Sequence, residues 1–241
     1  MMRKIAIVLA GGRGSRMKSS VPKQYLLLND KPVLYYSLKM FQESDVDDII
    51  LISGQEEIEF CQKEIADKYH FNKIVKIIEG GAERYDSVYN GLRAARELCG
   101  GSDNLKNVYI LIHDGARPCV DKNIFDNCME AVREFGACTA AVPVKDTIKV
   151  VDKDGFAVET PERSSLWQIQ TPQAFRFDII AQAYQKMYQD TQKGTITDDA
   201  MLVEKYTDIK VKMAIGSYNN IKITTPEDMG MALQIINGKC G

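Results

Sequence analysis

The chain has 241 residues, of which 45% are hydrophobic and 27% are charged, a composition typical of globular proteins and unlike that of disordered chains. Its 31 Lys and Arg residues against 33 Asp and Glu residues give a net charge of −2, so no overall positive field attracts nucleic acid or an anionic membrane. Any phosphate site must therefore be local, and neither nucleic acid nor a membrane is expected as a partner.

Strand and helix patterns alternate through the first part of the chain. β-branched apolar runs that end in turn residues predict strands over residues 4–10, 48–53, 73–79, 108–113 and 138–142. Apolar residues at helical spacing predict helices at residues 33–43, 58–65, 83–98 and 122–135. Because strand–helix repeats build parallel sheets covered on both faces, we predict a Rossmann-like α/β fold with a mostly parallel sheet and helices on both faces.

This rhythm stops after residue 143. Short alternating stretches at residues 147–151, 156–160 and 167–170, separated by turn signals, predict a β-arm that protrudes from the main sheet at about residues 144–170. The pattern then predicts further helices and strands, at residues 177–188, 198–206, 210–215 and 220–224. A last helix is predicted after Thr225, a suitable N-cap, and Gly238 can end it. No linker or internal repeat divides the chain, so we expect residues 1–241 to form one domain.

The cysteine pattern and the length of the first apolar run indicate in which cellular compartment the protein resides. The six cysteines form no Cys-x-x-Cys pair and the chain has two histidines, which argues against a zinc site and favours reduced thiols. The apolar run at residues 5–10 is too short for a membrane span or a usual signal-peptide core. We therefore expect a cytoplasmic protein.

The most informative segment directly follows the first predicted strand. Residues 9–17 read Leu-Ala-Gly-Gly-Arg-Gly-Ser-Arg-Met, and Pro-Lys-Gln follows at residues 22–24. Glycines at a strand end let bare backbone N–H groups approach an anion closely, which predicts a phosphate cradle. The cations Arg16 and Lys23 beside it suit a triphosphate whose charge shifts during a reaction.

This glycine segment has three alternative interpretations. A dinucleotide fingerprint requires a third glycine where Met17 stands, and no Gly-Lys-Ser/Thr string of a P-loop is present. A plain glycine turn with solvated charges remains an alternative when this segment is taken alone.

The segment resembles the signature loop of sugar- and polyol-phosphate nucleotidyltransferases. Further motifs occur in the order found in the 2-C-methyl-D-erythritol 4-phosphate cytidylyltransferases, and together the match runs from residue 5 to about residue 235. They read Gly-Gly-Ala-Glu-Arg-Tyr-Asp-Ser-Val (80–88), His-Asp-Gly-Ala-Arg-Pro (113–118), Pro-Val-Lys-Asp-Thr (143–147), Gln-Thr-Pro-Gln (170–173), Thr-Ile-Thr-Asp (195–198) and Asn-Ile-Lys (220–222). This ordered set is far more specific than any single motif.

The resemblance implies a reaction of CTP with 2-C-methyl-D-erythritol 4-phosphate, which yields the CDP-linked methylerythritol and pyrophosphate in the non-mevalonate route to isoprenoids. It implies that Arg16 and Lys23 stabilise the transition state and that Arg163 and Lys222 orient the attacking phosphate. The nucleotide-binding positions that it implies are Ala10, Gly11, Gly12, Gly14, Gly80, Gly81 and Ser87. The positions that it implies for the second substrate are Asp114, Arg117, Thr147, Thr171 and Thr195. Judged singly, each of six of these residues could equally be a solvated surface residue: Arg117, Thr147, Arg163, Thr171, Thr195 and Lys222.

Asp114 is also the candidate Mg²⁺ ligand. It follows an apolar strand, and the carboxyl ends of strands are where open α/β sheets bind ligands. One carboxylate there can help to hold Mg²⁺ on a phosphate chain, although a helix cap or a partner for Arg117 is the simpler alternative. For the adjacent His113 we favour packing or hydrogen bonding, because a phosphomonoester attacks without a general base.

The predicted arm contains Thr147 and Arg163. In relatives this arm clasps the second subunit of a homodimer, so the resemblance implies that both residues complete the neighbour's active site. The main rival function is that of a ribitol 5-phosphate cytidylyltransferase. Its members commonly read Asp-Ser-Val-Arg-Pro where residues 114–118 read Asp-Gly-Ala-Arg-Pro, and they lack the Arg-x-x-Leu-Trp string of residues 163–167. An inactive nucleotide-binding module is a more distant alternative.

Overall fold

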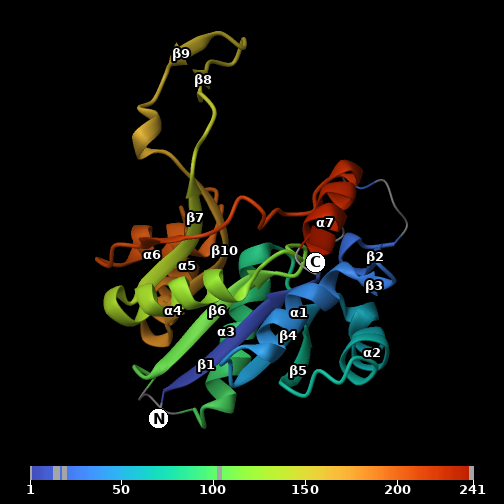
Figure 1. Cartoon of the computed structure of the whole chain (residues 1–241). Helices are drawn as coiled ribbons and strands as arrows, with labels where there is room; N and C mark the ends of the chain where they lie inside the picture. Colours follow the sequence, from blue (N-terminus) through green and yellow to red (C-terminus); the bar gives the residue numbers. More distant parts are fainter. Residues whose placement is uncertain (1, 13–16, 18–20, 102–104, 239–241) are drawn as a thin grey trace.

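The computed structural model describes residues 2–12, 17, 21–101 and 105–238. A central sheet has helices on both of its faces, and a thin arm projects from one end of the body (Figure 1). The sheet has seven strands in the order β11-β7-β10-β6-β1-β4-β5. Their bounds are β1 Arg3–Leu9, β4 Asp48–Ser53, β5 Ile74–Glu79, β6 Val108–Asp114, β7 Ala137–Pro143, β10 Trp167–Arg176 and β11 Lys212–Ile215.

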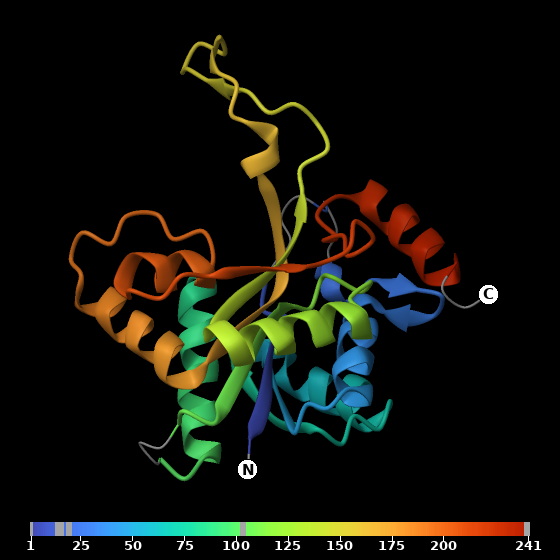
Figure 2. The same cartoon turned by 60° about the vertical axis from the view of Figure 1, so that its left-hand side comes forward.

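Two apolar layers hold the helices to the sheet. Helices lie on both sides of the sheet (Figure 2). Helices α1 and α4 pack through one buried cluster, which contains Leu38 and Phe125. Helices α3, α5 and α6 pack through another, which contains Val88 and Tyr184. The helix bounds are α1 Val33–Glu43, α3 Arg84–Leu98, α4 Lys122–Phe135, α5 Phe177–Gln189, α6 Asp199–Tyr206 and α7 Pro226–Gly238. Strands covered on both faces must be apolar throughout, and all six residues of β4 are buried.

The predicted fold class is confirmed, with one change in the sheet. Strand β1 pairs in parallel with β4 and β6, and β11 pairs in parallel with β7. Strand β10, however, lies between β6 and β7 and is antiparallel to both. The sequence analysis assigned residues 167–170 to the arm, because the buried Gln170 and Gln173 interrupt the apolar pattern of this strand.

The protruding segment is a thin hairpin. The strands β8 (Val150–Val151) and β9 (Ala157–Glu159) pair antiparallel, and all of their residues are exposed. A 3-10 turn at Arg163–Ser165 leads back to β10. These strands are shorter than the predicted stretches at residues 147–151 and 156–160. Two-stranded hairpins are marginal in water without a surface to pack on.

Smaller elements complete the chain. The predicted helix near residues 58–65 consists of a 3-10 turn, the short helix α2 (Ile58–Phe60) and a π-helical turn (Cys61–Asp67). A hairpin of β2 (Leu27–Leu28) and β3 (Lys31–Pro32) was not predicted. The strand predicted at residues 220–224 is wrong: this segment is a loop tied to the body by bonds such as that from the Ile223 amide to the Ala116 carbonyl, 2.8 Å.

Within the described ranges, no helix is long and apolar enough to cross a bilayer.

Candidate active site

Four parallel strands end at one edge of the sheet and bring the glycine segments together. Leu9 of β1 pairs with Asp114 of β6, so the residues that follow these strands are neighbours. On the other side, the Ala10 amide donates to the Ile52 carbonyl at 2.7 Å and the Gly80 amide to the Ser53 carbonyl at 2.9 Å. The two glycine pairs, at residues 11–12 and 80–81, therefore border the same space.

That space is a cavity of about 240 Å³, which we call the glycine cavity. Its polar lining includes Gly11, Gly12, Lys23, Gly81, Ser87 and Asp114, together with Arg84 and Lys222. A wider hollow of about 840 Å³ adjoins it, lined by the same glycines with Gly80 and Ser53. A Cβ on Gly81 would lie 2.2 Å from Cβ of Asp86, so only glycine fits there.

A second cavity, of about 290 Å³, lies on the β10 side of Asp114. Arg117, Gln170, Thr171 and Thr197 line it, and we call it the β10 cavity. Arg84, Asp114 and Lys222 line both cavities. These three side chains thus form the boundary between two adjacent binding spaces.

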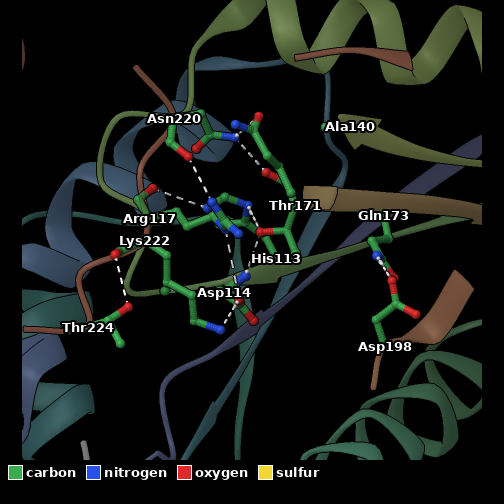
Figure 3. Close-up of polar contacts among 12 residues, drawn as sticks. His113, Asp114, Arg117, Ala140, Thr171, Gln173, Asp198, Asn220, Lys222 and Thr224 are labelled. Carbon is green, nitrogen blue, oxygen red and sulfur yellow. Dashed lines mark hydrogen bonds and ion pairs between the residues drawn. The ribbon is translucent and has the colours of Figure 1, made fainter. Parts of the chain in front are cut away.

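The charge cluster around Asp114 defines this boundary (Figure 3). Its carboxylate lies 2.7 Å from Nζ of Lys222, 3.5 Å from Nε of Arg84 and 3.9 Å from Nε of Arg117. Burial favours protonation, but Arg84, Lys222 and Arg117 outweigh it and hold the pKa of Asp114 well below its usual range. Three cations thus converge on one ionised carboxylate at the boundary of the two cavities, where they can meet anionic ligands.

Lys23 joins this site from a different segment of the chain. Its ammonium group donates to the Ile223 carbonyl at 2.7 Å, next to Lys222 in the sequence. The buried Gln24, one residue on, donates to the Ala10 carbonyl at the end of β1. The Pro-Lys-Gln string is therefore anchored on both sides of the glycine cavity.

His113 is fully buried behind the cluster. Its Nδ1 lies 3.0 Å from the Thr171 hydroxyl, which accepts a bond from the Asp114 amide at 3.1 Å. Its Nε2 lies 3.3 Å from the Arg117 carbonyl. Burial lowers the pKa of His113 to about 4, so the ring is neutral at pH 7. This geometry agrees with the packing and hydrogen-bonding role expected from the sequence.

The buried neutral His113 predicts a loss of stability in acid. The unfolded chain takes up the imidazole proton near pH 6.5, whereas the folded protein resists it until about pH 4. The free energy of unfolding should therefore fall by about 3 kcal/mol as the pH drops through this window, and a His113→Gln variant should lack that dependence. Urea unfolding at several pH values measures it.

The structure brings most of the predicted site residues to these cavities. Ala10, Gly11, Gly12, Gly81, Ser87, Lys23, Lys222 and Asp114 line the glycine cavity, Gly80 lines the hollow beside it, and Arg117 and Thr171 line the β10 cavity. Gly14 and Arg16 lie outside the described residues.

Three predicted residues lie away from the two cavities. Thr147 and Arg163 are exposed in the arm, where Nη1 of Arg163 donates to the Lys145 carbonyl at 3.2 Å. Thr195 is exposed in the segment before α6 and belongs to the lining of neither cavity as described.

Arg84 is a site residue that the sequence analysis did not assign. It is the first residue of α3, and its guanidinium lies between Asp114 and Asp199. Burial opposes its charge, but Asp199 and Asp114 outweigh burial and raise the pKa of Arg84. In the sequence, its position directly after the Gly-Gly-Ala-Glu string, at the start of a predicted helix, could have indicated that it belongs to the site.

Comparison with known proteins identifies the family. A family model described as 2-C-methyl-D-erythritol 4-phosphate cytidylyltransferase matches residues 4–238. The chain belongs to this family. Proteins named 2-C-methyl-D-erythritol 4-phosphate cytidylyltransferase from Lachnospira eligens and Lachnoclostridium phytofermentans are 53% and 47% identical to it. The alignments cover 97% of this chain and 99% of the first relative, and 98% and 97% for the second.

A solved structure supports the same assignment. The 4-diphosphocytidyl-2C-methyl-D-erythritol synthase from Anaerococcus prevotii is 32% identical to this chain and superposes with a TM-score of 0.81, covering 98% of this chain and 96% of that one. The predictions of the family, the fold class and a nucleotidyltransferase enzyme are confirmed. The ribitol 5-phosphate cytidylyltransferase alternative is not favoured.

Proposed function

We propose that this chain transfers the cytidylyl group of CTP to 2-C-methyl-D-erythritol 4-phosphate, releasing pyrophosphate. The observation that carries this proposal is the family match across almost the whole chain. The arrangement of the site supports it, because a group transfer between two anionic substrates needs two adjoining spaces that share their cations. Arg84 and Lys222 stand between such spaces.

In this proposal the nucleotide occupies the glycine cavity and the polyol phosphate occupies the β10 cavity. A phosphate oxygen of the polyol forms a bond to the α-phosphorus of CTP, while the bond from that phosphorus to the bridging oxygen of the β-phosphate breaks. Pyrophosphate leaves with that electron pair. Lys222 orients the attacking phosphate at the shared boundary, and Lys23, with Arg16, stabilises the charge on the α-phosphate and the leaving group.

The neutral His113 agrees with this chemistry. A phosphomonoester is already ionised at neutral pH, so no base has to remove a proton before attack. Arg117 supports placing the acceptor in the β10 cavity. Its buried Nε has no hydrogen-bond partner among the described residues, and an oxygen of the acceptor could satisfy it.

The residues present fit Mg²⁺ as the cofactor. Mg²⁺ is usually held by one or two carboxylates together with substrate phosphates and water. Asp114 is ionised, lines the glycine cavity and is 9% exposed, whereas no cluster of three or more metal-ligating side chains occurs in the described ranges. We infer that Asp114 would hold Mg²⁺ on the triphosphate, where the ion would neutralise phosphate charge.

The active form is proposed to be a homodimer built through the arm. The arm exposes large apolar side chains that a partner surface could cover, Val151 at 55%, Phe156 at 72% and Val158 at 62%. In this dimer, Thr147 and Arg163 of one subunit would complete the acceptor site of the other.

Mixing two inactive variants tests this arrangement. Lys23→Ala and Arg163→Ala homodimers should each be nearly inactive. Their heterodimer has one site with both residues intact, so random exchange of subunits should restore about one quarter of wild-type turnover. Mixed Lys23→Ala and Lys222→Ala subunits are the control and should stay inactive, because both changes fall in the same subunit's cavity. Failure of the first mixture to recover activity after exchange contradicts a shared site.

Acceptor and nucleotide choice test the function itself. Pyrophosphate release should be measured for each nucleoside triphosphate with methylerythritol phosphate, ribitol 5-phosphate or a hexose 1-phosphate. Rapid release with CTP and methylerythritol phosphate alone is the expected result. A preference for ribitol 5-phosphate would overturn the proposed acceptor and leave the reaction class intact.

A further inference from the structure

Arg84 is held by a buried carboxylate that lines neither cavity as described. Its Nη1 donates to Oδ2 of Asp199 at 2.8 Å, while its Nε lies 3.5 Å from Oδ1 of Asp114. The Asp199 side chain is 1% exposed, whereas that of Arg84 is 31% exposed. The guanidinium therefore has one buried anchor and one partner in the site.

Asp199 is itself fixed from two other elements. The hydroxyl of Tyr184 on α5 donates to its Oδ1 at 2.6 Å. The side chain of Gln173 on β10 accepts from the Asp199 amide at 3.0 Å and donates to Asp198 at 2.7 Å. Both carboxylate oxygens of Asp199 thus have partners, and the residue cannot turn without breaking a buried bond.

This anchoring controls how Arg84 approaches Asp114. Guanidinium and carboxylate groups favour bidentate pairing, with two parallel hydrogen bonds. Bidentate pairing with Asp114 would draw the guanidinium out of its present place between Asp114 and Asp199. The bond to Asp199 keeps Arg84 from closing onto Asp114, so the guanidinium remains at the boundary of the two cavities.

We propose that Asp199, fixed by Tyr184, is a positioning residue that holds Arg84 at the boundary between the nucleotide and acceptor spaces. This inference rests on the proposed function. It adds a chain of hydrogen bonds that runs from Tyr184 on α5 through Asp199 on α6 to Arg84 at the cavity wall. Asp199 acts through Arg84 and touches neither substrate.

The test compares Asp199→Asn and Tyr184→Phe with the wild-type enzyme in steady-state kinetics. Misplaced groups at a reacting centre cost up to about 10²-fold, so Asp199→Asn should lower kcat/KM for the acceptor by about that factor and raise its KM. Tyr184→Phe removes a single hydroxyl and should lower kcat/KM about two- to tenfold. A smaller folded fraction would lower kcat and leave KM unchanged, so unchanged KM in both variants contradicts the proposal.

Tyr206→Phe is the matched control. Tyr206 is the last residue of α6, the helix that begins with Asp199, and its hydroxyl donates to Asp190 at 2.7 Å. This bond resembles the one between Tyr184 and Asp199, but Tyr206 and Asp190 line neither cavity as described. This variant should keep wild-type kcat and KM. If Asp199→Asn does not fold, Tyr184→Phe decides, and wild-type kinetics in that variant overturn the proposal.

A double variant separates positioning from a direct effect. If Asp199 acts through Arg84, then Arg84→Ala with Asp199→Asn should be no slower than Arg84→Ala alone. Multiplied losses in the double variant would contradict the inference. Wild-type protein that releases no pyrophosphate with any acceptor would instead refute the proposed function, so the two failures are distinguishable.

Discussion

Lys23→Ala should lower kcat by about 10²- to 10³-fold, equivalent to about 3 to 4 kcal/mol of transition-state stabilisation. The bond from Nζ to the Ile223 carbonyl fixes the ammonium group at the glycine cavity before any substrate arrives. A fixed cation needs no reorganisation when charge moves from the α-phosphate to the departing pyrophosphate. Its removal should therefore affect turnover more than the KM for CTP.

Pyrophosphate release and thermal unfolding together check this expectation. The melting temperature should stay close to that of the wild type, because the lost hydrogen bond lies at the cavity rather than in the core. Lys39→Ala on the outer face of α1 is the matched control, since Lys39 is exposed and pairs with Glu43 at 3.8 Å. Near-normal turnover in Lys23→Ala would contradict its assignment. Arg16→Ala should behave similarly, on the basis of the family resemblance.

Asp114→Asn should impair both activity and stability. Its carboxylate balances the charges of Arg84, Arg117 and Lys222, and removing one partner from a buried ion cluster typically costs about 3 kcal/mol or more. Turnover should fall by about 10²-fold or more, because the reacting phosphates lose an ordered cation arrangement and the proposed Mg²⁺ ligand. Metal-free CTP should bind at least as tightly as before, since the site becomes more positive.

Asp48→Asn is the control for the stability component of this prediction. Asp48 and Asp114 are equally exposed, at 9%, and Asp48 pairs with Arg3 at 2.7 Å at the start of β4, the opposite end of the strand from the glycine cavity. Asp48→Asn should therefore lower the melting temperature and leave kcat unchanged. Calorimetry of CTP binding without metal completes the comparison. Wild-type turnover in Asp114→Asn, or weaker binding of metal-free CTP, would rule out the role given to this carboxylate.

Burial on both faces made three central strands predictable from the sequence, whereas buried polar residues prevented the prediction of a fourth. Strands β1, β4 and β6 are buried on both faces, so each appears as a continuous apolar run. Strand β10 is equally central, yet its buried Gln170 and Gln173 look like surface residues in sequence. Their hydrogen bonds to Ser217 and Asp198, each from a distant segment, make their burial possible.

Some residues of the candidate site were likewise predictable from the sequence, and others were not. The glycine segments and Lys23 stand in short local motifs, because strand ends and tight turns place them by backbone geometry alone. The Arg84–Asp199 pair joins residues 115 positions apart, and no local pattern indicates that contact. Thr147 and Arg163, in the arm, remain predictions that depend on a second subunit.

The amino-acid sequence by itself determined the family, the class of reaction and the segments that approach phosphate, since ordered motifs and strand–turn chemistry are local properties of the chain. Only the tertiary structure decided that β10 enters the sheet antiparallel, that three cations converge on Asp114, and that two cavities share this boundary. Such contacts depend on which distant segments pack together, and packing compensates the cost of burying charges and amides that the sequence alone places at the surface.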